Sequence, residues 1–297
     1  MHRARIALET GATIFLDVLF KGQSLFYRLR GLRIYFFALG TAVRLLAAGR
    51  TTIGLKLLIA SVGYWRLLPN AVVWEEAAAI PHPRILDVSS PKLVSLYLAA
   101  RTGGDVLATD LNDREIFNRW LKMAEIRGLS NYRVEYQDAR QLALPDSTFD
   151  VVYSLSVIEH IPGNGDREAL QEFARVTKPG GVIVVEVPYR RKFEEVFRKT
   201  DSKGAALERE EFFERRYDAA ALEQKLLQVV GLRLERKMIL GEWLAIDPVI
   251  NGDRLPRLLR IAALPWEPWL AAVNYWMRPD DSAGHPLAAL MVYRKVA

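Results

Sequence analysis

Short β-rich runs alternate with helix-like runs from about residue 81 onward, and this alternation limits the possible folds more than any other feature of the sequence. The β-rich runs are residues 84–88, 105–109, 132–136, 149–154 and 182–187. The helix-like runs are residues 92–101, 113–127 and 167–177. Alternation of this kind predicts βαβ units, and therefore a mainly parallel sheet with helices on both faces.

The last part of the chain departs from simple alternation. A helix is predicted over residues 218–230, a strand over 232–240 and a final strand over 287–294. Between these strands, residues 247–286 contain six prolines and three tryptophans, which is too much unpatterned sequence for a tight turn. We therefore expect one domain over residues 81–297 with an insertion at 247–286. The basic, apolar stretch 255–261 inside the insertion predicts an amphipathic helix.

Residues 1–80 differ in charge from the rest of the chain. They contain ten basic and four acidic residues and so carry the whole net charge of +6, because the other 217 residues hold 31 of each sign. Their apolar runs are interrupted by arginine and lysine, so we expect a helical extension that does not span a membrane. Glu9 and Asp17 interrupt the first apolar run, so a cleavable signal peptide is not expected.

Two roles for this extension remain open. Its basic, apolar helices would suit an anionic membrane surface, or they would pack as a cap on the domain or as a homodimer interface. A nucleic acid partner is not expected, because the cations are interleaved with apolar residues and no binding motif is present.

Aspartates follow three successive strands of the predicted sheet, where ligands of open parallel sheets bind. Asp87 ends the first strand, Asp110 ends the second and Asp138 follows the third. Asp110 lies 23 residues after Asp87, which is the spacing at which a carboxylate accepts hydrogen bonds from a ribose diol. A lone aspartate there would more readily cap the next helix. Three of them indicate a nucleoside site, in which Leu111 flanks the base and Asp138 accepts from its amine.

The stretch Phe149–Ile161, FDVVYSLSVIEHI, and the following RVTKPGG at residues 175–181 are similar to signatures of class I S-adenosylmethionine-dependent methyltransferases. This resemblance implies a Rossmann-like, seven-stranded sheet whose last strand is antiparallel. It also implies S-adenosylmethionine as cofactor, with Asp110 on the ribose. The adenine would lie against Asp138 and Ala139, and the methionine end against Ser154, Leu155 and Ser156.

The turn after the first strand departs from the family pattern. Glycines are usual there, but this chain has Ser89, Ser90 and Pro91. Serine restricts the backbone, although its hydroxyl can donate to the carboxylate of the cofactor, and proline suits the first turn of a helix. Two functions follow: a methyltransferase acting on a small-molecule or lipid-like acceptor, or a catalytically silent relative that serves as a binding module.

Candidate catalytic residues follow the fourth and fifth strands. His160 would act as a general base on the acceptor or would have only a structural role beside Glu159. Metal-dependent relatives have a glutamate where this chain has Ser156, so no metal site is expected. Tyr189 would border the acceptor pocket. The basic residues after it either contact an anionic group or form a solvated charge run. We expect a cytoplasmic protein, with peripheral membrane attachment as the alternative.

Overall fold

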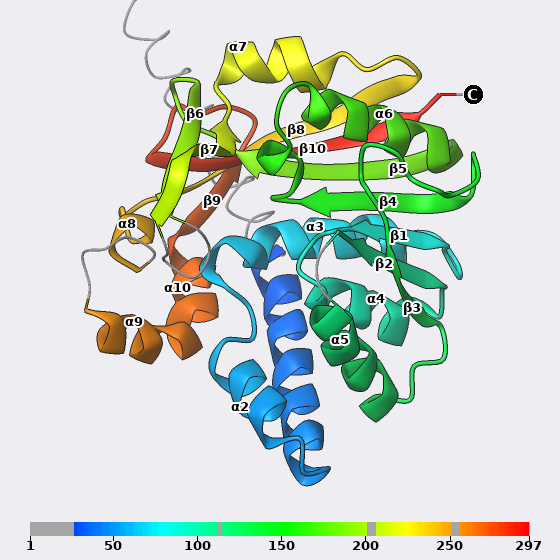
Figure 1. Cartoon of the computed structure of the whole chain (residues 1–297), viewed down its shortest axis with the longest axis vertical. Coiled ribbons are helices and arrows are strands. Elements are labelled where there is room, and N and C mark those ends of the chain that lie inside the picture. Colours follow the sequence, from blue (N-terminus) through cyan, green and yellow to red (C-terminus); the bar gives the residue numbers. More distant parts are fainter. Residues whose placement is uncertain (1–26, 112–113, 201–205, 251–255, 297) are drawn as a thin grey trace, which may run out of the picture.

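A computed structural model describes residues 27–111, 114–200, 206–250 and 256–296 of the chain. Its centre is a mixed sheet with helices on both faces (Figure 1), in the strand order β3-β2-β1-β4-β5-β10-β8-β9. The parallel strands are β1 (Ile85–Val88), β2 (Val106–Asp110), β3 (Tyr132–Tyr136), β4 (Phe149–Leu155) and β5 (Thr177–Pro188). The other three are β8 (Leu232–Glu242), β9 (Tyr275–Arg278) and β10 (His285–Lys295). The predicted α/β, Rossmann-like class is confirmed.

The antiparallel last strand is also confirmed. β10 lies between β5 and β8 and runs antiparallel to both. Among the described residues, however, the sheet has eight strands and not the expected seven, because the insertion supplies β9, which pairs with the end of β8. Gly241 of β8 makes this pairing possible, since a Cβ there would lie 2.2 Å from the indole ring of Trp276.

The helices form two layers. The helices α3 (Leu67–Ala78), α4 (Leu93–Thr102) and α5 (Arg114–Ile126) cover one face, and α6 (Gly165–Val176) and α7 (Ala219–Leu222) cover the other (Figure 1). The helix predicted over 218–230 is shorter, since α7 passes into a π-helical turn at Glu223–Leu227. Each layer buries its own apolar cluster against the sheet. This placement leaves the carboxyl ends of the parallel strands at one edge.

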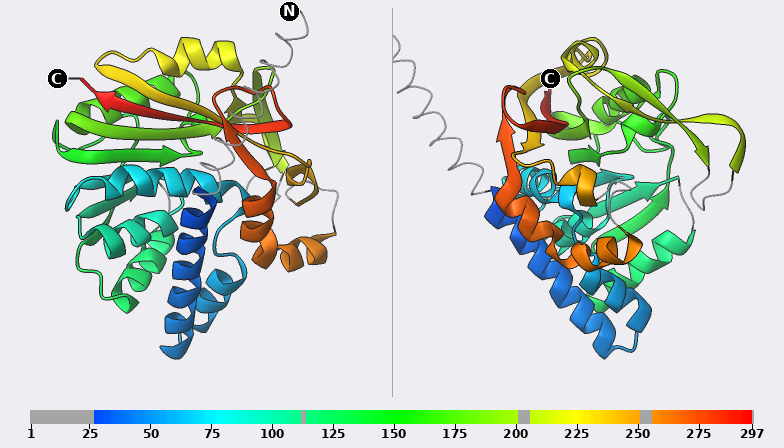
Figure 2. Two further views of the ribbon diagram at one scale, coloured as in Figure 1. Left: turned by 180° about the vertical axis from the view of Figure 1, so that it is seen from behind. Right: turned by 90° about the vertical axis from the view of Figure 1, so that its left-hand side faces the viewer.

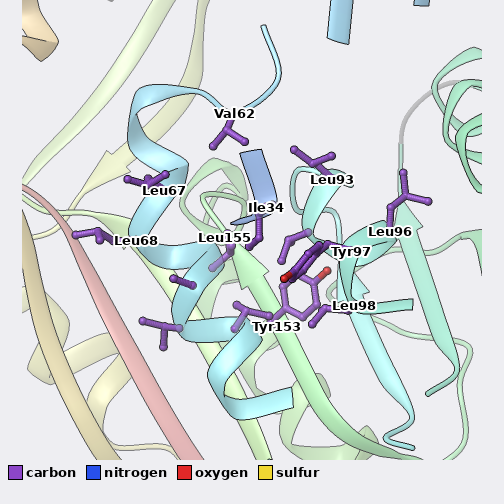
Figure 3. Packing of buried hydrophobic residues seen from close by; sticks show 14 of the residues in the cluster. Ile34, Val62, Leu67, Leu68, Leu93, Leu96, Tyr97, Leu98, Tyr153 and Leu155 are labelled. Carbon is purple, nitrogen blue, oxygen red and sulfur yellow. The ribbon is translucent and has the colours of Figure 1, made fainter. Parts of the chain in front are cut away.

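The N-terminal segment shares the core of one layer. A helix over residues 27–47 is followed by α2 (Thr51–Ile59) and a 3₁₀ turn at Tyr64–Arg66. Figure 3 shows Ile34 of this helix beside Leu155 of β4 and Tyr97 of α4. In the part of the chain that the structure describes, no single helix is long and apolar enough to cross a membrane. The pair Thr51–Ile59 and Tyr64–Ala78 meets the test together but is bent by 72°.

In its described residues, 247–250 and 256–286, the insertion contains three α-helices and the edge strand β9. The helices are α8 (Asp247–Ile250), α9 (Arg257–Ala263) and α10 (Glu267–Asn274). In both views of Figure 2, α10 lies alongside the helix over residues 27–47, and the Trp269 ring is 5.9 Å from the ring of Tyr35. The predicted amphipathic stretch 255–261 corresponds to α9, except that residue 255 lies outside the described residues.

A hairpin that the sequence did not indicate follows β5. Its strands β6 (Glu194–Thr200) and β7 (Ala206–Arg216) pair only with each other. Because these residues are highly charged and carry few β-branched side chains, their composition favours a helix over a strand. The buried guanidinium of Arg215 fastens the hairpin to the loop after β4, where it donates to the carbonyl oxygens of Ile161 and Gly163 at 2.8 and 2.5 Å.

Candidate functional site

A cavity of about 510 Å³ opens at the carboxyl ends of β1, β2 and β4. Its volume is typical of small-molecule sites. Five residues singled out from the sequence line it: Ser89, Asp110, Leu111, Ser156 and His160. Val157 and Ile161 complete the wall after β4, and Arg198, Phe212 and Phe213 of the hairpin cover it. The hairpin thus closes a space that the sheet alone would leave open.

Two serines of the lining have left-handed backbones. The φ angle is 56° at Ser89 and 50° at Ser156, in the region that glycine adopts most readily. A non-glycine residue held there costs about 1 to 2 kcal/mol. Ser89 therefore has a backbone conformation that glycine would adopt without this cost.

Beneath the cavity floor lies a buried cation that the sequence did not reveal. The Lys92 ammonium donates to the carbonyl oxygen of Thr109 at 2.8 Å and to Asp87 Oδ1 at 3.3 Å, and it lies 4.0 Å from Asp110 Oδ2. Burial raises the pKa of the Asp87 carboxyl, and the charge of Lys92 opposes that rise. Lys92 thus links the ends of β1 and β2 and attracts the Asp110 carboxylate, which reaches the cavity.

Four predicted cofactor residues lie in this floor and not in the lining. Asp87, Ser90, Ser154 and Leu155 are each buried. The Ser90 hydroxyl donates to the carbonyl oxygen of Val88 at 3.4 Å and accepts from the backbone N–H of Leu155 at 2.8 Å. The Ser154 hydroxyl donates to the carbonyl oxygen of Val88 at 3.2 Å. These side chains hold β1 against β4.

Three further predicted residues lie outside the lining. The Asp138 carboxylate forms an ion pair with Arg140 at 2.7 Å, which holds its pKa below the usual range. Ala139 is buried in the apolar cluster under α6. The hydroxyl of Tyr189 donates to Asp281 at 3.0 Å, and burial raises its pKa to about 12. The roles of these residues in adenine or acceptor binding stay predictions.

Two buried glutamates adjoin the cavity behind Ser156 and His160. Both carboxylate oxygens of Glu159 are buried without a hydrogen-bond partner, and burial together with the charge of Glu186 raises its pKa well above the usual value. Glu186 Oε2 accepts from the Ser156 hydroxyl at 2.8 Å and lies 3.3 Å from the Arg66 guanidinium. The N-terminal segment therefore supplies a counter-charge next to the site. Within the described residues, no group of three or more potential metal ligands is present.

His160 is oriented by the hairpin. Its Nδ1 lies 2.7 Å from the carbonyl oxygen of Phe213, and because that oxygen only accepts, Nδ1 carries the proton and donates. In the neutral ring the other nitrogen, Nε2, then has a free lone pair, 3.7 Å from Glu159 Oε1. This tautomer is the one that a general base requires.

The arrangement fits a nucleoside ligand. Asp110 presents a carboxylate at the end of β2, and Leu111 beside it is 45% exposed and offers an apolar surface to a base. A carboxylate in this position accepts both hydroxyls of a ribose. Ser89 and Ser156 leave room at the turns after β1 and β4. The fold and the cavity together are those of an α/β domain with a site suited to a nucleoside.

Comparisons with known proteins narrow that class. Residues 86–185 match a family described as methyltransferase domain. A probable S-adenosylmethionine-dependent methyltransferase of Mycolicibacterium smegmatis is 30% identical over 153 residues, which are 50% of this chain and 55% of that protein. A demethylmenaquinone methyltransferase of Renibacterium salmoninarum is 31% identical over 129 residues, 43% of this chain and 50% of that protein. The chain spans about half the length of these curated relatives.

The structure of coclaurine N-methyltransferase bound to N-methylheliamine and SAH has the same fold. It has a TM-score of 0.50 and 11% identity, and the match covers 76% of this chain and 69% of that one. With the sequence matches, this identifies residues 86–185 as a class I S-adenosylmethionine-dependent methyltransferase domain. The expected cofactor class, S-adenosylmethionine, is confirmed with it.

Sequence reasoning missed several residues around the site. Lys92 follows a proline at a predicted helix start and gave no sign of burial. Glu186 did give a signal, because it is the one charge in the apolar run 182–187. The hairpin residues Arg198, Phe212 and Phe213 gave none.

Proposed function

We propose that the protein transfers a methyl group from S-adenosylmethionine to a small, lipid-like acceptor. The observation that carries the proposal is the convergence of Ser89, Asp110 and Ser156 on one cavity at the carboxyl ends of the strands. The bound cofactor supplies an activated methyl group on a sulfonium. Asp110 would hold its ribose, Leu111 its base, and the turns at Ser89 and Ser156 its methionine end.

His160 is the group of the chain best placed to move a proton. Its Nε2 would accept the proton of an acceptor hydroxyl, while the Nδ1–H bond to the Phe213 carbonyl fixes the ring. Phe212 and Phe213 of the hairpin would exclude water from the reacting groups.

The acceptor class rests on two observations. One relative is a demethylmenaquinone methyltransferase, which supports a quinone-like acceptor. The cover of the cavity is also aromatic, with Phe212 and Phe213 opposite the polar strand ends. The same proposal includes a cytoplasmic protein that binds peripherally to a membrane surface. It is supported by exposed apolar side chains on α9 and on the 3₁₀ turn before α10, including Leu258 and Trp266. A homodimer through this face is the competing prediction, and sedimentation velocity distinguishes it.

Calorimetric titration with S-adenosylmethionine and S-adenosylhomocysteine tests the cofactor site. We expect the Asp110→Ala variant to bind both about thirty- to a hundredfold more weakly, because hydrogen bonds to a charged group are lost. Asp105→Ala is the matched control, since Asp105 is exposed at the opposite end of the same strand. Equal affinities of the two variants would refute the ribose assignment. No binding by the native protein would favour the silent-module alternative.

Transfer of labelled methyl groups to a short-chain demethylmenaquinol tests the activity itself. His160→Ala is expected to lower kcat by about a hundredfold or more at unchanged cofactor affinity, as loss of a general base does. An unchanged kcat would leave His160 with a structural role.

A further inference from the structure

A second cavity, of about 620 Å³, lies between the helix over residues 27–47 and the helices α3 and α4. None of its lining residues belongs to the lining of the cofactor cavity. Three of them are arginines: Arg33 on the N-terminal helix, Arg101 at the end of α4 and Arg127 just after α5. In Figure 1 the dark blue N-terminal helix runs next to α4 and α5, so residues distant in sequence meet here.

Within the described residues, the positive charges of the three arginines are not neutralised. None of the three forms an ion pair with a carboxylate there. Arg127 donates only to neutral oxygens, the carbonyl of Phe37 at 2.7 Å and the hydroxyl of Thr41 at 2.8 Å. Its pKa is lowered by burial and by the positive charges of Arg44 and Arg101. Gathered cations without counter-charges favour the binding of an anion.

Aromatic rings and Gly40 form the rest of the wall, and the rings hold two of the guanidinium groups in place. Arg127 lies 4.0 Å from the centre of the Phe37 ring, and Arg101 lies 5.9 Å from that of Tyr97. Tyr97 in turn packs edge-on against Phe37 and Trp74, at 5.2 and 5.0 Å. These contacts order the cations without neutralising them, so the cavity is preorganised for an anion with an apolar part.

The rim of the cavity continues into an exposed apolar surface. Phe36 lines the cavity and is 54% exposed, and its ring lies 6.0 Å from that of Trp269 on α10. Beyond it lie exposed large apolar side chains of α9, α10 and the turn between them: Leu258, Leu259, Ile261, Trp266 and Val273. Residues 27–47, α2 and α9 contain no acidic residue. A surface of this composition is typical of contact with an anionic lipid layer.

We propose that this second cavity binds the anionic phosphate head group of a membrane lipid. The phosphate would lie on Arg33, Arg101 and Arg127, and the apolar chains would leave past Phe36 towards α10. A free phosphate would satisfy the arginines but would leave the adjoining apolar rim exposed to water, which is why the lipid is the favoured source. The proposal does not depend on methyl transfer.

Vesicle co-sedimentation of the full chain tests it, with phosphatidylcholine vesicles and with vesicles that also contain phosphatidylglycerol. The test variant is Arg33→Gln/Arg101→Gln, because both side chains are exposed and neither guanidinium forms a hydrogen bond with a described residue. Arg133→Gln/Arg209→Gln is the matched control, since it removes the same charge from two exposed arginines outside the cavity. We expect the native chain and the control to bind the anionic vesicles, and the test variant to bind at least about tenfold more weakly.

Three results would overturn the proposal. The first is equal binding of the native chain to neutral and anionic vesicles, or none to either. The second is an equal loss in the test variant and the control, which would indicate non-specific attraction. The third is calorimetric binding of inorganic phosphate without vesicle binding, which would make the ligand a soluble phosphate. S-adenosylmethionine titration of the same variants is expected to be unchanged, so failure of this site and failure of the cofactor site are distinguishable.

Discussion

Replacing Lys92 by methionine tests the role of the buried cation under the cofactor cavity. The side chain of Lys92 is 3% exposed and that of Asp87 is fully buried, so the substitution leaves a carboxylate without its counter-charge. Methionine fills a similar volume, and the main cost is therefore electrostatic. Protonation of Asp87 removes the unpaired buried charge, so the free energy of that protonation is the upper limit of the electrostatic loss of stability.

The limit follows from the ordinary pKa of the carboxyl, 3.8. Each pH unit between that value and the solution pH costs about 1.4 kcal/mol, so the penalty is at most about 4 kcal/mol at pH 7 and about 1.6 kcal/mol at pH 5. Proton linkage determines the direction in which the stability of the variant changes with pH. The folded variant keeps a proton on Asp87 that the unfolded chain has released, so its stability falls as pH rises above 3.8.

Urea unfolding followed by tryptophan fluorescence measures this free energy. We expect Lys92→Met to lose about 3 to 4 kcal/mol at pH 7 and about 2 kcal/mol less at pH 5. The double variant Lys92→Met/Asp87→Asn carries neither charge, so it should regain at least half of the loss and lack the pH dependence. The reasoning is refuted if the single variant loses less than about 1 kcal/mol at pH 7, loses the same at both pH values, or is no less stable than the double variant.

Three further predictions concern the lining and its cover. The Glu159→Gln variant should gain stability relative to the native chain as pH rises above 4.5. Burial raises the pKa of Glu159, so above pH 4.5 the unfolded native chain ionises this group while the folded chain does not, and the native free energy of unfolding falls. A constant difference between the two free energies of unfolding across this pH range would contradict the prediction. Ser89→Gly should change the free energy of unfolding by less than about 1 kcal/mol. Ser89→Val should lower it by about 1 to 3 kcal/mol, since valine tolerates a positive φ poorly. An equal loss of stability in the two variants would exclude the left-handed turn. Arg215→Gln should detach the hairpin, because the buried guanidinium donates hydrogen bonds to two carbonyl oxygens of the neighbouring loop. The expected result is faster tryptic cleavage within β6 and β7 and a raised KM for the acceptor. Arg209→Gln, on the exposed part of β7, is the control and should leave the cleavage rate and the KM unchanged.

Part of the candidate site was readable from the sequence because it depends on short-range order. Asp110, Leu111 and Ser156 each follow a strand directly, and parallel strands in a doubly wound sheet bring their carboxyl ends together. The same reasoning assigned Ser90 and Ser154 to cofactor binding. It located them at the right strand ends but did not reveal that their hydroxyls are used within the floor. Position along a strand predicts proximity to a site, whereas the direction of a side chain depends on its packing.

The sequence by itself determined the α/β class and the parallel strands, which follow from local periodicity and from turn residues that act within a few positions of themselves. The antiparallel last strand and the cofactor class followed from the resemblance of residues 149–161 and 175–181 to a known family. Only the tertiary structure decided that Arg66 pairs with Glu186, 120 residues away, that a charged segment pairs as the hairpin over the cavity, and that Arg33, Arg101 and Arg127 meet in one cavity. Contacts of this kind depend on how helices and sheet pack, and the free energy of burial that selects them is not a property of any local segment.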